Sequence, residues 1–206
     1  MSTAAKPNPI PNLLTALRLL AGVIMFLMLA GAMGGVPLLS AYLSPEDQFA
    51  LQRIAFIIFV IAASTDWGDG YLARRWHAES RWGAILDPIA DKILVTGTIV
   101  GLLASGTSAD VVIPYGLILF REFAVSALRE TTAGRFQLKV TMLAKWKTTL
   151  QLVALGAQLL ALIWTGAEDN WMPAFITFAD ILVWIAALVT LWTGWQYFAK
   201  ARGAMR

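Results

Sequence analysis

Four aspartates stand in residues 65–95, TDWGDGYLARRWHAESRWGAILDPIADKILV, among many apolar side chains. They are Asp66, Asp69, Asp87 and Asp91. Removing a carboxylate from water costs several kcal/mol unless a cation compensates its charge. Because hard cations prefer oxygen ligands, four carboxylates without histidine or cysteine suit Mg²⁺ or Mn²⁺ better than Zn²⁺. Two helices that each offer a pair of these acids can hold two such ions.

The spacing of the acids places each pair on one face of a helix. At 100° per residue, the acids and small residues of the first segment share an arc of about 100°: Asp66, Asp69, Gly70 and Ala73. A spacing of four does the same for Gly83, Asp87 and Asp91. Small residues let a flat base or a phosphate approach the helix backbone. They also permit close helix packing in membranes, which is the alternative interpretation.

The composition indicates the elements that carry these faces. Of 206 residues, 58% are apolar and 14% are charged, and the mean hydropathy is +0.67. These values are typical of an integral membrane protein. Apolar runs of the length needed to cross a bilayer, roughly 20 residues, lie at 13–31, 49–73, 84–103, 111–128, 146–163 and 171–198. The sequence predicts an all-α polytopic fold with six transmembrane helices in a single domain, 1–206, in which residues 1–11 form an N-terminal segment at the cytoplasmic membrane surface.

The first apolar run has a signal peptide as its alternative, because it follows Lys6 and precedes the small residues AGAMGG. Arg18 interrupts this run and five further runs follow, which favours an uncleaved first helix. The chain has no cysteine, which excludes a disulfide framework and a thiol nucleophile. We interpret the single histidine, His77, as a solvated loop residue.

The distribution of lysine and arginine predicts the orientation in the membrane, because cytoplasmic loops retain positive charge. The basic residues gather in two loops and the C-terminal tail: Arg74, Arg75, Arg81, Arg135, Lys139, Lys145, Lys200, Arg202 and Arg206. The alternate loops SAYLSPEDQ, SGTSAD and TGAEDN contain acids and no lysine or arginine. We therefore expect both termini and the four aspartates to face the cytoplasm.

A second group of charged residues suits an anionic substrate. Arg121 lies inside the apolar run LILFREFAV, and an ionised residue in a membrane segment is by default a functional candidate. With Arg129, Lys145 and Lys147 it can bind a phosphate on an acceptor molecule. Arg121 has an alternative, which is ion pairing with Glu122 or Glu130. The loop residues Arg135 and Lys139 are explained by anionic lipid alone.

The first apolar run begins with polar residues that can also contact a ligand. Asn12 is a candidate N-cap, since its side chain can accept a hydrogen bond from the backbone near Leu14 or Thr15. Thr15 and Arg18 then face the cytoplasmic mouth of the bundle. Capping and snorkelling account for these residues nearly as well as ligand binding does.

The spacing D-x2-D-G-x2-A-R-x8-G-x3-D-x3-D resembles the CDP-alcohol phosphotransferase family. Its eight positions are Asp66, Asp69, Gly70, Ala73, Arg74, Gly83, Asp87 and Asp91. The resemblance implies six transmembrane helices, usually in a homodimer, and two divalent cations held by the four aspartates. It also implies that Asp91 is the general base and that the cytidine of a CDP-linked donor packs on the small-residue face. The candidate CDP contacts are then Asn12, Thr15, Asp69, Gly70, Ala73, Arg74 and Gly83.

Further segments resemble the phosphatidylglycerophosphate synthase branch of that family. They are IPNLLTALR (10–18), TDWGDGYLARRW (65–76), WGAILDPIADKILV (82–95), REFAVSALRE (121–130) and KWKTT (145–149). The branch implies transfer of a phosphatidyl group from CDP-diacylglycerol to sn-glycerol 3-phosphate. The products are phosphatidylglycerophosphate and CMP, made during anionic phospholipid synthesis in the inner membrane of a bacterium. The partners implied are these substrates, membrane lipid and a second copy of the chain, with no nucleic acid.

Two alternatives stay open at this point. The same chemistry can use another acceptor, such as inositol phosphate or serine. A cation transporter is an alternative of a different class, in which the acids line an ion path. The clustering of the acids toward the cytoplasmic ends of two helices argues against it, because no ionisable relay reaches the other face.

Overall fold

The computed structural model describes residues 10–36, 41–76, 81–131, 142–164 and 170–204, with the backbone alone at 10–11, 66–76, 81–82, 84, 142–145 and 204. The chain divides into two compact units, Met1–Ser105 and Gly106–Arg206. Each unit contains three long α-helices, and the described residues are helical throughout apart from turns and short connections. The all-α fold predicted from the sequence is therefore confirmed. The prediction of one domain over residues 1–206 stays a prediction.

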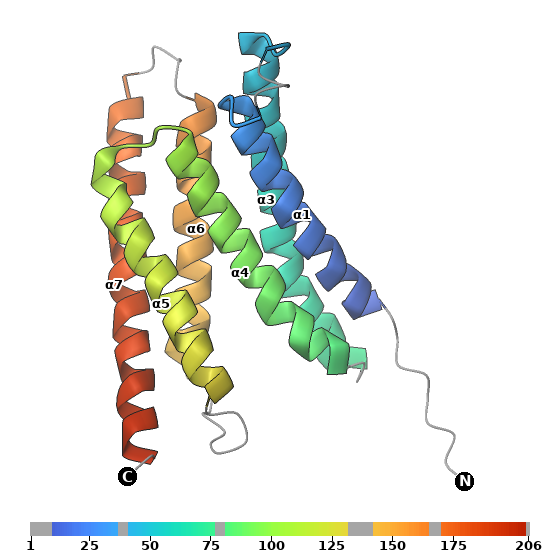
Figure 1. The fold of residues 1–206 in the computed structure, drawn as a ribbon, viewed down its shortest axis with the longest axis vertical. Coiled ribbons are helices and arrows are strands. Elements are labelled where there is room, and N and C mark those ends of the chain that lie inside the picture. The colour runs from blue at the N-terminus through green and yellow to red at the C-terminus, as the bar shows by residue number, and fades with distance from the viewer. Residues whose placement is uncertain (1–9, 37–40, 77–80, 132–141, 165–169, 205–206) are drawn as a thin grey trace. The chain divides into compact units, whose positions relative to one another are not determined.

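The first unit contains α1 (Ile10–Ala32), α3 (Pro45–Trp76) and α4 (Arg81–Ala104). The three helices lie side by side, and α1 packs against both of the others (Figure 1). The shortest of them, α1, has 23 residues. At about 1.5 Å per residue it is long enough to cross a hydrocarbon core of roughly 30 Å. Figure 1 shows that α1 and α4 begin, and α3 ends, at the same end of this unit.

The second unit contains the short 3₁₀ helix η1 (Ala109–Val111), α5 (Val112–Thr131), α6 (Met142–Trp164) and α7 (Met172–Ala204). Helix α7 packs against both α5 and α6. The interior of the second unit contains fully buried apolar side chains from all three long helices, among them Tyr115, Ile118, Leu155, Leu159 and Val183. Polar side chains are buried in the same unit, and they belong to the candidate site described below.

The ends of the helices follow from capping residues and glycines. Before α3, the Ser44 Oγ accepts a hydrogen bond from the Asp47 backbone N–H at 3.2 Å, and Asp47 Oδ2 accepts one from the Ser44 N–H at 3.0 Å. This is a capping box, with Pro45 in the first helical position. It explains why α3 begins four residues before the apolar run that predicted it. After α1, Gly34 has a φ of 80°, a left-handed conformation that glycine adopts without strain.

Two opposite faces of α1 have different surroundings. The exposed face contains Leu13, Leu17, Leu20, Ile24 and Leu27. The buried face contains Thr15, Arg18, Met25 and Leu29, with Gly22 between them. The spacing of three and four along both faces is that of a helix with one side in lipid and one side in the protein. The buried face of this helix is the one that reaches the candidate site.

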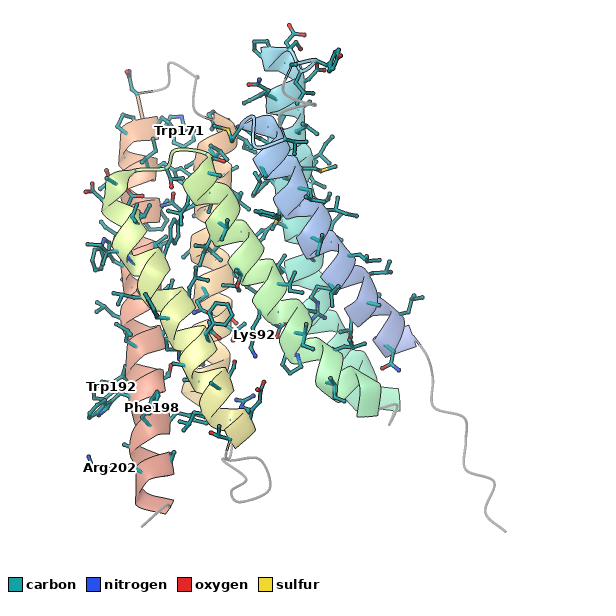
Figure 2. The ribbon with its side chains drawn as sticks, in the orientation of Figure 1. Lys92, Trp171, Trp192, Phe198 and Arg202 are labelled. Atoms are coloured by element: carbon teal, nitrogen blue, oxygen red, sulfur yellow. The ribbon has the colours of Figure 1, made fainter. Side chains whose placement is uncertain are left out.

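Five helices of the described residues contain a segment long and apolar enough to cross a membrane: α1, α3, α5, α6 and α7. The remaining long helix, α4, contains Asp87, Asp91 and Lys92 in its first half, which lowers its apolar content. The sequence predicted six transmembrane helices. The described residues form six long helices, of which five are apolar enough to span a membrane, and this is consistent with the predicted all-α polytopic membrane protein. Figure 2 shows Trp171 at one end of α7, with Trp192 and Phe198 toward the other, which is typical of side chains at the membrane interfaces.

Candidate active site

The aspartates of the motif lie on two helices of the first unit. Asp66 and Asp69 lie in the last third of α3, and Asp87 and Asp91 lie in the first half of α4. Because α3 ends where α4 begins, all four lie toward the same end of the unit (Figure 1). The side chains at residues 66–76 are not described, so only the helical placement of Asp66, Asp69, Gly70, Ala73 and Arg74 is known.

The two aspartates of α4 both accept hydrogen bonds from α1. The Thr15 hydroxyl donates to Asp87 Oδ1 at 2.6 Å. The Arg18 guanidinium donates to Asp91 Oδ1 at 3.1 Å and forms an ion pair with it. The Arg18 side chain is 1% exposed, whereas that of Asp91 is 39% exposed. Asp87 is also exposed, so both carboxylates can reach a ligand or a metal ion that arrives from the solvent.

These pairs belong to a longer parallel contact between α1 and α4. The Thr15–Asp87 and Arg18–Asp91 pairs are 72 and 73 residues apart in the sequence. The next contact is the Thr98 hydroxyl with the Met25 sulfur, also 73 residues apart. A constant separation means that the two helices run in the same direction and in fixed register. This register places Thr15 beside Asp87 and Arg18 beside Asp91.

Two glycines, one on each helix, allow α1 and α4 to approach closely between these contacts. A Cβ placed on Gly22 would lie 3.3 Å from the backbone N and Cα atoms of Leu94. A Cβ on Gly97 would lie 3.3 Å from the Gly22 carbonyl oxygen. Larger side chains at either position would push the helices apart. The short distances at Thr15 and Arg18 depend on this approach.

The other sequence-predicted residues of the first unit are placed as follows. Gly83 lies half-buried in the first turn of α4. Asn12 is also half-buried, but α1 begins at Ile10, so Asn12 lies inside the first turn and the expectation of an N-cap is wrong. Pro11 lies in the same turn, where a proline costs no helical hydrogen bond. The helix can therefore begin before Asn12. His77 and residues 1–9 lie outside the described part of the chain.

In the second unit, the predicted phosphate-binding residues form a buried polar network around Glu122. Glu122 Oε1 accepts from Arg121 Nη1 at 3.2 Å, from Gln151 Nε2 at 3.3 Å and from the Lys147 ammonium. Arg121 and Lys147 are largely buried, with side-chain exposures of 10% and 8%. The ion pairing of Arg121 with Glu122 that the sequence left as an alternative is therefore present. It does not exclude a ligand, because two cations share one carboxylate and leave a net positive charge.

Helix α7 completes this network through two threonines. Gln151 donates to Thr190 Oγ1 at 2.8 Å, and Arg121 Nη2 donates to Thr193 Oγ1 at 3.1 Å. Next to Thr193, a Cβ on Gly194 would lie 2.9 Å from Arg121 Cγ, so this glycine makes room for the arginine stem. The Arg121 Nε is buried and has no hydrogen-bond partner among the described residues. Three helices therefore fix the position of Arg121.

The remaining candidate cations are less tightly enclosed. The Arg129 guanidinium donates to the Tyr197 hydroxyl at 3.4 Å and lies 5.6 Å from the centroid of that ring. Arg129 is exposed, two turns beyond Arg121 on α5. Lys145 lies in the first turn of α6, with its backbone alone described. Arg135 and Lys139 lie outside the described residues.

Several polar residues of these networks were not identified as functional candidates from the sequence. They are Gln151, Thr190 and Thr193, and Glu122 was considered only as a partner of Arg121. The sequence contains one usable signal, because Lys147 and Gln151 are four residues apart and therefore share a helix face. No comparable signal links Thr193 to Arg121, which is 72 residues away in the sequence.

The chemistry of the motif acids fits hard divalent cations, because all of their donor atoms are carboxylate oxygens. Among the side chains that the structure describes, no group of three or more potential metal ligands comes together. Only two of the four motif aspartates belong to that set, Asp87 and Asp91. Their exposure and their spacing of four on α4 are compatible with shared cations.

The sequence was compared with models of known protein families, and one of these models matches most of the chain. The family model described as CDP-alcohol phosphatidyltransferase matches residues 8–192, a range that covers most of both units. The chain belongs to this family. The family was expected from the eight motif positions, and the match confirms that expectation.

Similar proteins come from several bacteria. A relative from Cereibacter sphaeroides is 39% identical, over 93% of this chain and 95% of its own length. Relatives from Haemophilus influenzae and Escherichia coli K12 are each 41% identical, over 74% and 72% of this chain and 79% and 78% of their own. All three are named CDP-diacylglycerol–glycerol-3-phosphate 3-phosphatidyltransferase. These names agree with the branch that the sequence segments resemble.

Proposed function

We propose that the protein transfers the phosphatidyl group of CDP-diacylglycerol to the hydroxyl of sn-glycerol 3-phosphate, giving phosphatidylglycerophosphate and CMP. The observation that carries this proposal is the similarity to the Cereibacter sphaeroides relative, which bears the name of this activity and aligns with 93% of the chain. The four-aspartate motif lies within the aligned family match. No observation favours an inositol or serine acceptor, or a cation transporter.

In this reaction the acceptor hydroxyl oxygen attacks the phosphorus of the phosphatidyl group, and the bond from that phosphorus to the CMP oxygen breaks. We assign Asp91 the acceptance of the hydroxyl proton, since a general base must reach the proton that it removes. Its 39% exposed side chain is accessible for that role. No cysteine is available for a covalent intermediate, so direct displacement is the simpler course.

We assign the metal site to Asp66, Asp69, Asp87 and Asp91, which would hold two divalent cations, Mg²⁺ or Mn²⁺. When bound, these ions neutralise the charge that develops on the pyrophosphate of the donor. The all-oxygen donor set supports this assignment. The placement of Asp66 and Asp69 in the last third of α3 supports it as well.

The CDP moiety of the donor is assigned to the small-residue face of α3 and the first turns of α1 and α4. The residues proposed to contact it are Asn12, Thr15, Asp69, Gly70, Ala73, Arg74 and Gly83. Glycine and alanine at these positions leave room for a flat base beside the helix backbone.

The acceptor phosphate is assigned to Arg121, Arg129, Lys145 and Lys147. The excess of cations over carboxylates in the Glu122 network supports this assignment, because a buried net positive charge requires an anion for compensation. Arginine donors also match the geometry of phosphate oxygens. These residues would orient the acceptor hydroxyl toward the donor phosphorus.

We further propose that the protein acts as a single domain and a homodimer in the inner membrane of a bacterium, with both termini facing the cytoplasm. The continuous family match over residues 8–192 supports one domain. The membrane-spanning segments and the bacterial relatives support the location. The distribution of lysine and arginine supports the orientation.

An acceptor panel tests the proposed reaction. Purified protein in detergent is given CDP-diacylglycerol, Mg²⁺ and one acceptor, and CMP release is measured. We expect sn-glycerol 3-phosphate to exceed glycerol by at least about 10³-fold, because a site built for a charged group leaves its own cations unpaired when that group is missing. A chelator should abolish release. Efficient use of serine or inositol would refute the acceptor, and no release with any acceptor would refute the enzyme class.

A further inference from the structure

Helix α1 gives the two carboxylates of α4 chemically different partners. Asp87 accepts from a neutral hydroxyl, that of Thr15, at 2.6 Å. Asp91 accepts from a cation, Arg18, at 3.1 Å. Thr15 and Arg18 are each only 2% exposed, so both donors are built into the interface between the helices. Among the side chains that the structure describes, Asp91 is therefore paired with a cation and Asp87 is paired with a neutral hydroxyl.

We propose that Thr15 and Arg18 are positioning residues that make Asp87 and Asp91 unequal metal ligands. Thr15 orients Asp87 and leaves its full negative charge to attract a cation. Arg18 orients Asp91 and cancels part of its attraction for the same cation. This inference rests on the proposed function, which assigns both aspartates to the metal site. It gives Thr15 a role through Asp87, in addition to the contact with the nucleotide that the proposed function assigns to it.

The geometry of the helix pair supports this division. Both hydrogen bonds end on an Oδ1 atom, and each carboxylate has a second oxygen that can face a cation. The Arg18 side chain is 1% exposed and that of Asp91 is 39% exposed, so the arginine lies on the inner side and the carboxylate on the solvent side. Carboxylates that bind metals are commonly oriented by hydrogen-bond donors, and the loss of a neutral donor such as the Thr15 hydroxyl weakens metal binding about 10- to 100-fold. A cationic donor such as Arg18 also repels the metal ion, and this repulsion ends when the cation is removed.

The simpler alternative is that both pairs only fasten α1 to α4. In that case the loss of either donor would lower the stability of the protein. It would not weaken metal binding for the neutral donor, Thr15, and tighten it for the cationic donor, Arg18. The inference predicts opposite changes for the two residues. This difference in sign separates a positioning role from a structural one.

Thr15→Val removes the hydroxyl and keeps the shape of the side chain. We expect it to weaken Mn²⁺ binding by about tenfold, because Asp87 loses its orienting donor. Thr15→Ser retains a hydroxyl at the same atom and should bind Mn²⁺ as the wild type does. The matched control is Thr98→Val, because Thr98 is buried in the same interface and donates to the Leu94 carbonyl of its own helix. This control should leave Mn²⁺ affinity unchanged.

Arg18→Met removes the charge and retains an apolar stem of comparable reach. We expect it to tighten Mn²⁺ binding by about tenfold, because a cation near the divalent ion no longer opposes it. Asp91 is partly exposed, so its carboxylate stays hydrated after the partner is lost, and the variant should still fold. Arg18→Lys keeps the charge and should bind Mn²⁺ with an affinity close to that of the wild type.

The test uses the full-length protein in detergent and Mn²⁺ alone, without substrate. Free Mn²⁺ is quantified by electron paramagnetic resonance during titration, and circular dichroism checks that each variant is folded. Weaker binding by Thr15→Val together with tighter binding by Arg18→Met supports the inference. Equal binding by all variants, or a shift of both in the same direction, overturns it while the proposed function stands. If the wild type bound no Mn²⁺, the metal site of the proposed function would be refuted as well.

Discussion

The reactivity of a carboxylate in this protein depends on what surrounds it. Asp91 lies near the cytoplasmic end proposed for α4, partly exposed and paired with a buried arginine. Asp180 lies inside α7, where its carboxylate accepts from Gln158 at 2.6 Å and links α7 to α6. The first aspartate can meet a substrate, whereas the second is used in helix packing. Location and partners, rather than residue type, therefore distinguish a candidate catalytic acid from a structural one.

Replacing the proposed general base tests this distinction. Asp91→Asn keeps the shape of the side chain and removes both the proton acceptor and one metal ligand. We expect the turnover number for CMP release to fall by at least about 10²-fold, which is the lower end of general-base contributions. The matched control is Asp110→Asn, which changes an exposed aspartate that has no role in the proposed site. Turnover of purified Asp91→Asn equal to that of the wild type would exclude the assignment.

The cations around Glu122 should affect a different kinetic constant. Arg121→Ala and Lys147→Ala each remove one donor from the proposed phosphate site, while Glu122 keeps another cationic partner. We expect the KM for sn-glycerol 3-phosphate to rise about tenfold or more, with the KM for CDP-diacylglycerol nearly unchanged, because a charged hydrogen bond contributes roughly 1.5–3 kcal/mol.

Arg53→Ala serves as the control for these two variants. It removes an exposed cation that lies 4.9 Å from the Phe49 ring on α3, far along the chain from the Glu122 network. Initial rates measured over a range of each substrate give both KM values. A loss of affinity for CDP-diacylglycerol in Arg121→Ala and Lys147→Ala, with the acceptor KM unchanged, would contradict the division of the site.

The charged candidate residues could be found from the sequence because a charge in or beside an apolar segment needs a partner or a function. Their partners could not be assigned in the same way. The bond from Gln151 to Thr190 joins residues 39 positions apart, and the bond from Thr15 to Asp87 joins residues 72 positions apart. These pairings depend on how the helices pack, and a threonine in an apolar helix commonly bonds to a carbonyl of its own helix instead.

At the scale of the helices, apolar length predicted which segments form, and local capping decided where they end. The run expected to begin at residue 49 begins at Pro45 because Ser44 and Asp47 cap the helix. The run expected to begin at residue 13 begins at Ile10. The parallel register of α1 and α4 was not predictable, because small residues in a membrane helix are equally compatible with ligand access and with helix packing.

The register of α1 and α4 leads to a prediction about stability. Gly97→Leu places a large side chain where a Cβ alone would lie 3.3 Å from the Gly22 carbonyl. We expect a loss of about 1–3 kcal/mol in the free energy of unfolding, because overpacking separates the helices. Activity should also fall, since the same separation moves Thr15 and Arg18 away from Asp87 and Asp91.

Gly116→Leu on α5 is the control, because a Cβ there meets nothing within 4 Å. It should retain both the unfolding midpoint and the rate of CMP release. Thermal unfolding in detergent, followed by circular dichroism, compares the two variants. Equal stability of Gly97→Leu and the wild type would show that the α1–α4 approach has room to adjust, and it would contradict the fixed register.

At the scale of the whole molecule, the two units contribute different chemistry. The first contains the motif aspartates, and the second contains the buried cations of the Glu122 network. The family match extends into both units. The proposed function uses both groups in one reaction, the acids for metal ions and the cations for the acceptor phosphate. The proposed function therefore predicts that both groups face the same side of the membrane, because the proposed acceptor is a charged molecule that does not cross the bilayer.

This requirement makes orientation the decisive property of the whole chain, and the absence of cysteine makes it testable. Single cysteines are introduced as Tyr42→Cys, His77→Cys, Asp110→Cys and Lys139→Cys. Tyr42 is 86% exposed and is preferred to Asp47, whose side chain caps α3.

We expect an impermeant thiol reagent on intact cells to label positions 42 and 110, and to label positions 77 and 139 only after permeabilisation, because loops rich in lysine and arginine remain cytoplasmic. CMP release by each variant confirms that the labelled protein is folded. Labelling of position 77 but not of position 110 on intact cells would reverse the orientation, and it would place the aspartates on the side opposite to the cytoplasmic substrates.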